Sequence, residues 1–236
     1  MDKLRVLAVG AHPDDVELLC AGTLAKFARK GNKVFIIHVC NGDLGGKGIS
    51  RKKLAQVRKA EARESGALIG AKVLGPICSD LGTFLSKDNV HKLIELIRQV
   101  MPDIIMTHSP DDYMSDHVNT SRLVFEASFG ATVPNYKTRS KAHELIMPVF
   151  YMDTLAGVNF LPTDYVDITK EWEIKKKMFL CHRSQHGWLK GHHKADATEL
   201  METMARFRGV QCGVKLAEGF RKMDVWGRLK PERLLP

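Results

Sequence analysis

The chain has 236 residues, of which 44% are hydrophobic and 27% charged, a composition typical of a globular protein that forms one domain over residues 1–236. Its longest apolar stretches are only as long as a strand, which excludes a membrane span. Its first residues lack the charged segment followed by an apolar segment that is typical of a signal peptide, so we expect a cytoplasmic protein. The net charge of +9 permits an anionic partner, but the basic residues are dispersed and carry no nucleic-acid motif, so we do not expect a nucleic-acid partner.

The N-terminal stretch predicts a buried strand followed by a helix, with polar residues at the junction. Residues 4–9 form an apolar run interrupted only by Arg5, and residues 16–27 carry apolar side chains at a 3.6-residue period. Between them lie His12, Asp14 and Asp15, where open α/β sheets bind ligands. An ordinary helix start would account for Pro13, Asp14 and Asp15, because proline and acidic residues both suit the first turn of a helix. It would not account for His12.

The rest of the chain alternates between strand and helix patterns. Apolar, β-branched runs predict strands at residues 33–40, 72–78, 103–107, 149–154 and 165–168. Amphipathic patterns predict helices at residues 51–65, 89–100, 169–179 and 196–208, and one that begins at Asp116. This alternation predicts an α/β fold, a Rossmann-like, doubly wound and mainly parallel sheet with helices on both faces. In the helix at 51–65, Arg58 and Glu61 are spaced for an i, i+3 ion pair.

A second group of histidines and acids follows the strand expected at 103–107. Its members are His108, Asp111, Asp112, Asp116 and His117. Two strand ends that each carry His and Asp predict a shared metal ion. Catalytic zinc takes three protein ligands, and His12, Asp15 and His117 supply two imidazoles and a carboxylate. Asp14 is then free to take a proton from metal-activated water, which is the chemistry of amide or ester hydrolysis.

Two further segments are expected to be irregular. Residues 130–147 are polar and basic, which suggests an excursion over the site or an oligomer contact. Residues 181–193 contain four of the ten histidines, and we expect a loop there, either substrate-lining or merely solvated. The last two of these histidines, His192 and His193, lack the i, i+4 spacing of a helical metal pair.

The five cysteines are widely spaced and include no Cys-x-x-Cys pair. An odd number at such spacings argues against a disulfide framework or a thiolate zinc site. We therefore expect reduced thiols with mainly structural roles. Likewise, the glycine-rich residues 41–48 match neither the dinucleotide fingerprint nor the Walker pattern, so a nucleotide cofactor is not expected.

Five motifs together resemble the LmbE-like, or PIG-L, family of zinc-dependent de-N-acetylases. They lie at residues 11–17, 41–43, 111–117, 182–185 and 217–220. The resemblance implies one zinc ion held by His12, Asp15 and His117, with Asp14 as the general base. It implies N-acetylglucosamine conjugates as substrates and a homo-oligomeric assembly. Supporting or substrate-binding roles are expected for Asp43, Asp112, Asp116, His182 and His186.

The chain departs from this family in one motif, which commonly reads His-Pro-Asp-His. The first of those histidines is implied to stabilise the tetrahedral intermediate, and Met114 stands in its place here. A thioether cannot donate a hydrogen bond to an oxyanion. Either His182, His186 or Tyr113 replaces that donor, the enzyme is weakened, or the change is a local repacking. The role of Asp116, which would orient the missing histidine, is left open.

The sequence thus predicts a deacetylase that removes an N-acetyl or other N-acyl group from an N-acetylglucosamine-type conjugate. One rival is a catalytically weakened homologue that binds metal and sugar, which Met114 favours. A second is an amidase for a non-sugar N-acyl metabolite, because the motifs indicate the reaction more than the substrate. A nucleic-acid binder ranks last.

Overall fold

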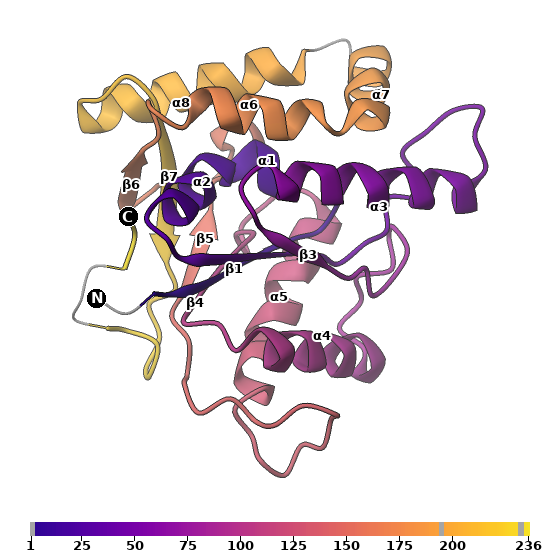
Figure 1. The fold of residues 1–236 in the computed structure, drawn as a ribbon, viewed down its shortest axis with the longest axis vertical. Coiled ribbons are helices and arrows are strands. Elements are labelled where there is room, and N and C mark those ends of the chain that lie inside the picture. The colour runs from indigo at the N-terminus through magenta and orange to yellow at the C-terminus, as the bar shows by residue number, and fades with distance from the viewer. Residues whose placement is uncertain (1–2, 194–195, 231–233) are drawn as a thin grey trace.

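The computed structural model describes residues 3–193, 196–230 and 234–236. These residues contain a seven-stranded sheet with the order β3-β2-β1-β4-β5-β7-β6 (Figure 1). Its strands are β1 (Arg5–Gly10), β2 (Lys33–His38), β3 (Lys72–Leu74), β4 (Ile104–Thr107), β5 (Val149–Met152), β6 (Asp164–Asp167) and β7 (Ala217–Lys222). The first five strands run parallel, and β7 is antiparallel to both β5 and β6.

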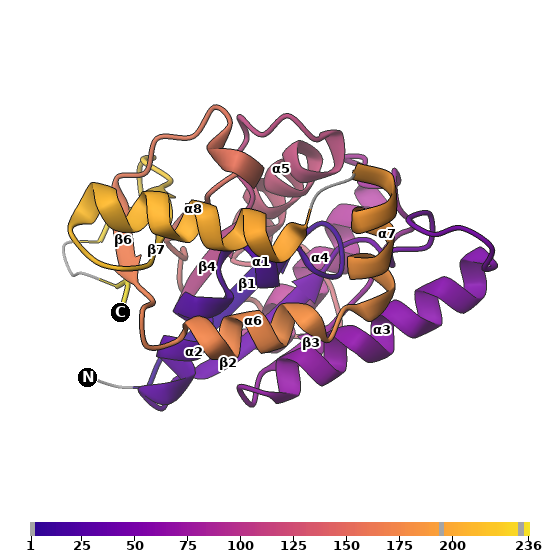
Figure 2. The same ribbon diagram turned by 90° about the horizontal axis from the view of Figure 1, so that it is seen from above.

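Helices cover both faces of the sheet. They are α1 (Asp15–Leu19), α2 (Ala21–Arg29), α3 (Arg51–Ala67), α4 (Lys87–Val100), α5 (Ser115–Gly130), α6 (Trp172–Leu180), α7 (Arg183–His193) and α8 (Ala197–Cys212), with a short 3-10 turn at Leu155–Gly157. Helices α1, α2, α6 and α8 lie on one side and α4 and α5 on the other (Figures 1 and 2). This confirms the predicted doubly wound α/β fold. Within the described ranges, no helix is both long enough and apolar enough to cross a membrane.

Strand β1 contributes to two separate cores because its side chains alternate between the faces. Val6 and Ala8 pack in the core beneath α2 and α6, whereas Leu7 and Val9 pack in the core beneath α4 and α5. All four side chains are fully buried. Burial on both faces explains why the parallel strands appear in the sequence as continuous apolar runs rather than as alternating patterns.

The first helix, expected to be continuous over residues 16–27, is divided at Cys20. This residue has φ −144°, outside the helical range, and separates α1 from α2. The carboxylate of Glu218 on β7 accepts hydrogen bonds from Gly22 N (2.9 Å) and Thr23 N (2.7 Å). Glu218 therefore caps the N-terminus of α2. Periodicity alone could not show this break, because the capping residue lies on the opposite end of the chain.

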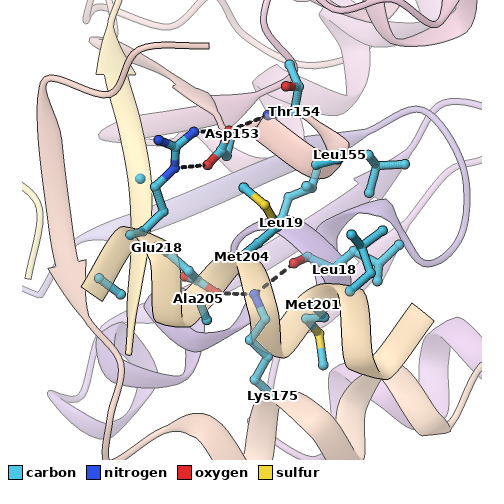
Figure 3. Close-up of a pocket in the computed structure, with 15 residues that line it drawn as sticks. Leu18, Leu19, Asp153, Thr154, Leu155, Lys175, Met201, Met204, Ala205 and Glu218 are labelled. Atoms are coloured by element: carbon cyan, nitrogen blue, oxygen red, sulfur yellow. Dashed lines mark hydrogen bonds and ion pairs between the residues drawn. The ribbon is translucent and has the colours of Figure 1, made fainter. Parts of the chain in front are cut away.

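The same carboxylate lines a pocket between α6, α8 and β7 (Figure 3). Lys175 Nζ lies 2.5 Å from Glu218 Oε1 and donates to Leu18 O at 2.8 Å. Arg208 Nε donates to Asp153 Oδ2 at 2.6 Å, on the other side of the pocket. Each of these buried charges is paired with an opposite charge, and the two ion pairs join α6 and α8 to the sheet. We assign it a structural role.

Residues 183–193 form helix α7, so the expectation of a loop there was wrong. The carboxylate of Glu61 on α3 accepts hydrogen bonds from Ser184 N (2.9 Å) and Ser184 Oγ (2.6 Å) at the start of α7. Glu61 therefore stabilises the helix N-terminus instead of pairing with Arg58. The side chains of His192 and His193 lie outside the described part of the structure.

The segment after α5 contains no helix or strand from residue 131 to residue 148, which confirms its predicted irregularity. The guanidinium of Arg98 on α4 donates to the carbonyls of Ala131 (3.0 Å), Val133 (2.8 Å) and Tyr136 (2.8 Å). Glu95 accepts hydrogen bonds from Ser140 N at 3.0 Å and Ser140 Oγ at 2.9 Å. Two polar side chains of α4 thus hold this excursion on the body of the protein.

Candidate metal and catalytic site

The candidate site lies at the carboxyl ends of β1 and β4. These strands are neighbours, and β2 lies on the other side of β1. The crossover connections therefore leave β1 in opposite directions, which makes the junction a topological switch point. The loop after β1 carries residues 11–14, and the loop after β4 carries residues 108–114. Both loops open at the same edge of the sheet, as parallel pairing requires.

The structure brings together the three residues expected to bind metal. His12 Nδ1 lies 3.4 Å from Asp15 Oδ2, and His117 Nε2 lies 3.3 Å from Asp15 Oδ1. One ligand atom from each residue lies within 4.8 Å of the other two. His117 is fully buried, and its Nε2 has no hydrogen-bond partner among the described residues. A buried nitrogen that has no hydrogen-bond partner and faces a carboxylate fits the role of a metal ligand.

The charges around His117 also fit a cation. Burial by itself would lower the pKa of His117, but the carboxylates of Asp15 and Asp112 raise it to about 9. The site thus attracts positive charge, which a divalent ion supplies in place of a proton. Asp112 Oδ2 lies 3.0 Å from His117 Nδ1, the carboxylate–histidine arrangement that fixes the ring of a zinc ligand. The two imidazoles and one carboxylate match catalytic zinc sites.

Asp116 supports the other imidazole. Its Oδ2 lies 3.1 Å from His12 Nε2 and accepts a hydrogen bond from Leu81 N at 2.9 Å. Its Oδ1 accepts a hydrogen bond from Thr83 Oγ1 at 2.5 Å. With His12 Nε2 held in this way, Nδ1 faces Asp15. Asp112 and Asp116 therefore orient one histidine each.

Asp14 lies beside these residues in a strained backbone conformation. Its φ of 130° is one that side chains other than glycine rarely adopt. Its side chain is buried, and burial raises the pKa of Asp14 to about 6, while the nearby Arg58 guanidinium opposes that rise. A buried carboxyl group with a pKa of about 6, held in a strained turn, is suited to proton transfer near neutral pH.

Arg58 is a site residue that sequence reasoning missed. Its Nη2 donates to Pro13 O at 2.7 Å and lies 3.4 Å from Asp14 Oδ1, while its Nη1 donates to Gly42 O at 3.2 Å. A Cβ at Gly42 would lie 2.5 Å from Arg58 Nε, so glycine is required for this approach. The available signal was the position of Arg58 one turn from both Leu54 and Ala62, on the buried face of α3.

His108 is a second residue of the site to which the sequence pattern assigns no role. Its Nε2 accepts a hydrogen bond from Ala11 N at 2.9 Å and lies 3.2 Å from Asp15 Oδ2. Its ring stacks on His117 with a centroid separation of 3.9 Å and an angle of 16°. Burial lowers the pKa of His108 to about 4, which keeps the ring neutral. His108 therefore contacts the loop after β1 through Ala11 and two of the three residues of the trio, Asp15 and His117.

His182 lies behind the site on a buried carboxylate. His182 Nε2 lies 3.1 Å from Glu17 Oε1, which also accepts a hydrogen bond from Ser65 Oγ at 2.6 Å. Both His182 and Glu17 are fully buried. His186 packs edge-on against Phe179, with ring centroids 6.0 Å apart. Both histidines therefore have partners inside the protein, and their supporting or substrate-binding role stays a prediction.

Asp43 has contacts in neighbouring loops and none with the trio in the described structure. Its carboxylate accepts hydrogen bonds from Arg51 Nε (2.8 Å), Ser79 Oγ (2.6 Å) and Asp80 N (3.2 Å). Asp43 therefore joins the loop after β2 to the loop after β3. Tyr113, by contrast, is 56% exposed in the loop that carries Asp112.

Known proteins resemble this chain over most of its length. It is 28% identical to the 4-oxalmesaconate hydratase of Pseudomonas putida over 77% of this chain and 74% of that protein. It is 27% identical to the diacetylchitobiose deacetylase of Thermococcus kodakarensis over 93% of this chain and 83% of that protein. The crystal structure of the conserved protein TT1542 from Thermus thermophilus has a TM-score of 0.80 and 26% identity, covering 98% of this chain and 100% of that one.

A family model gives the assignment. The model described as PIG-L, GlcNAc-PI de-N-acetylase, matches residues 7–128, which include the last four residues of β1, the loop after β4 and all three candidate metal ligands. The match covers just over half of the chain. This protein therefore belongs to the PIG-L family, which is a family of enzymes, and the relatives of this chain include deacetylases.

Proposed function

We propose that this protein is a metal-dependent deacetylase that removes an N-acetyl or other N-acyl group from an N-acetylglucosamine-type conjugate. The observation that carries the proposal is the convergence of His12, Asp15 and His117 beside the carboxylate of Asp14, which lies outside that trio. Relatives named as deacetylases of diacetylchitobiose and of an inositol-linked acetamido sugar support the substrate class.

Each residue of the site has a separate role in the proposed amide hydrolysis. A zinc or other divalent ion held by the trio would supply Lewis-acid chemistry, which polarises an acyl carbonyl and acidifies water. Asp14 takes the proton of the attacking water and returns it to the departing amine. Arg58, bonded to the carbonyls of Pro13 and Gly42, keeps the Asp14 carboxylate in position.

Tyr113 is the proposed donor to the oxyanion in place of the histidine that Met114 replaces. Tyr113 follows Asp112 in the loop after β4, and burial together with the carboxylates of Asp112 and Asp15 raises the pKa of its hydroxyl. A neutral phenol can donate the hydrogen bond that a thioether cannot. His182 is the weaker candidate, because it is fully buried against Glu17.

The test is a substrate panel with two readouts, free acetate and free primary amine. The zinc-loaded protein is incubated with N-acetylglucosamine, diacetylchitobiose, an inositol-linked N-acetylglucosamine and a non-sugar N-acetyl amine. We expect acetate and amine in equal amounts from at least one sugar. Release from the non-sugar amide alone would replace the sugar with another N-acyl substrate, and no release from any compound would contradict the proposal.

A second candidate function is the addition of water to an unsaturated acid. It is favoured by the similarity to a 4-oxalmesaconate hydratase, which is as close in identity as the similarity to the deacetylase. The two candidates differ in product. Loss of the absorbance of 4-oxalmesaconate without acetate release from any sugar would favour hydration.

We also propose that the protein assembles as a homo-oligomer in the cytoplasm. Large apolar side chains are exposed on its surface, among them Trp226 (96%), Phe84 (67%) and Phe129 (56%), which supports burial against another copy. The free thiols of all five cysteines support a reducing compartment. Light scattering after size-exclusion chromatography tests the assembly, and a monomer mass at micromolar concentration would contradict it.

A further inference from the structure

Two cysteines lie side by side next to the candidate metal site. Cys40 follows β2 and Cys78 follows β3, and the two residues pair as an isolated parallel β-bridge. Their Sγ atoms are 4.0 Å apart. Residues paired in adjacent strands lie about 4.7–4.9 Å apart, which falls within the Cα separation that a disulfide requires. The backbone therefore already has a spacing at which these sulfurs can bond.

The two thiols differ in accessibility and acidity. Cys78 is partly exposed, whereas Cys40 is fully buried. The hydrogen bond from Cys40 lowers the pKa of the Cys78 thiol, although burial opposes that shift. Because the thiolate is the reactive form, Cys78 is the better nucleophile toward a small oxidant from solvent. Cys40 is placed to react with it next.

We propose that Cys40 and Cys78 form a redox modification site, at which a small hydroperoxide such as hydrogen peroxide converts the thiol pair into a reversible disulfide. The Cys78 thiolate attacks one peroxide oxygen, the O–O bond breaks, and hydroxide leaves and takes a proton to become water. The Cys40 sulfur then attacks the Cys78 sulfenic acid, an S–S bond forms, and the S–O bond breaks to release a second water. Two thiols are oxidised and one peroxide is reduced.

The pair is close enough to affect the site. Cys40 Sγ, one ring nitrogen of His12 and one carboxylate oxygen of Asp116 lie within 4.8 Å of one another. Leu81 and Thr83, in the loop that follows Cys78, hold the Asp116 carboxylate. Drawing the sulfurs together moves these loops and changes the Asp116 contact with His12. Loss of such a supporting contact lowers metal affinity about 10–100-fold.

The test uses the full chain, reduced and then exposed to a small excess of hydrogen peroxide. Peptide mapping by mass spectrometry without reductant is expected to show a Cys40–Cys78 linked pair, and a thiol assay to show two fewer of the five thiols. Dithiothreitol is expected to restore both. Cys78→Ser removes the link. Cys212→Ser, which alters an exposed thiol on α8, keeps it.

Two outcomes would overturn the modification site: Cys40 and Cys78 both remaining as thiols at a peroxide dose that oxidises Cys212, or oxidation of Cys78 to sulfinic acid without a link. The effect on the site is measured separately as zinc affinity, which is expected to fall about tenfold in the disulfide form. Unchanged zinc affinity in the linked protein would overturn that effect. The effect on zinc affinity rests on the proposed metal site, whereas the linkage does not, so failure of the proposed function leaves the linkage result interpretable.

Discussion

The Nε2 atom of His117 lies 3.3 Å from Oδ1 of Asp15, although His117 lies near the start of α5 and Asp15 begins α1. The pairing exists because β1 and β4 are parallel neighbours whose carboxyl ends meet at one edge of the sheet. Each strand end supplies part of a candidate ligand set that neither loop could complete alone. The adjacent Asp14 carboxylate turns this arrangement from a binding site into a candidate catalytic site.

Asp14→Asn is expected to keep the bound metal and to lower kcat for acetate release by about 10²–10⁴-fold, the usual contribution of a general base. The amide is nearly the same size as the carboxylate but cannot accept the proton. Steady-state kinetics and metal analysis of the same sample measure both quantities. Asp88→Asn, on the exposed surface of α4, is the control. An Asp14→Asn enzyme as fast as the parent would show that the base is another group.

Asp112→Asn is expected to weaken zinc binding by about 10–100-fold, because the carboxylate that orients His117 Nδ1 at 3.0 Å is lost. Competition with a chelating dye gives the affinity. Asp111→Asn is a matched control, since Asp111 is the preceding residue but pairs with Arg221. Equal zinc affinity in the two variants would mean that Asp112 does not orient a ligand.

Tyr113→Phe is expected to lower kcat by about 10²–10³-fold with little change in KM, as removal of one oxyanion donor does. The ring remains, so only the hydroxyl is tested. Phe207→Leu, an exposed aromatic substitution on α8, controls for general surface effects. An unchanged kcat for Tyr113→Phe would shift the donor role to His182 or to the metal alone.

Glu218→Ala is expected to lower the free energy of unfolding by about 3–5 kcal/mol, because it leaves the buried Lys175 ammonium without its partner and removes the cap of α2. Urea denaturation measures the change. Adding Lys175→Met to this variant removes the unpaired charge and is expected to recover part of the loss. Glu173→Ala, at an exposed position on α6, serves as the control. A loss no larger than that of the control would contradict the structural role of the pair.

Glu95→Gln is expected to make the stability of the protein less dependent on pH in acid. Burial opposes ionisation, but hydrogen bonds from Gln99 and from residues 138–140 lower the pKa of Glu95 from 4.5 to about 2. A carboxylate with a depressed pKa stabilises the fold above pH 4.5 and loses that contribution as the pH falls toward 2. The stability gap between wild type and variant, from urea midpoints, should therefore shrink over this interval. A gap that widens in acid would contradict the assignment, and the exposed Glu144→Gln is the control.

The fold was predictable because a parallel sheet buried on both faces leaves continuous apolar runs such as residues 34–37. The proximity of His12, Asp15 and His117 was predictable because the first two follow one strand and the third follows another strand that ends at the same edge of the sheet. Arg58 was not, since a buried arginine on a helix looks like a solvated one until its partners, the carbonyls of Pro13 and Gly42, are known. The pattern of residues along a helix does not show which distant residues its side chains contact.

The errors have the same origin. The continuous helix over residues 16–27 was wrong because Glu218 caps a new helix after Cys20. The loop expected at residues 181–193 was wrong because Glu61 caps α7 through Ser184. In both cases a carboxylate from another element satisfies backbone N–H groups, so tertiary contacts decide where the helix starts.

The most direct test of the account is the zinc content of protein purified without chelators. Mass spectrometry of the metal is expected to find about one zinc or similar divalent ion per wild-type chain, as a three-ligand catalytic site holds, and little or none in His12→Ala and His117→Ala. His91→Ala, which alters an exposed imidazole on α4, should retain the wild-type amount. A metal-free wild type, or a His117→Ala variant that keeps its ion, would contradict the claim that the two strand ends share one metal.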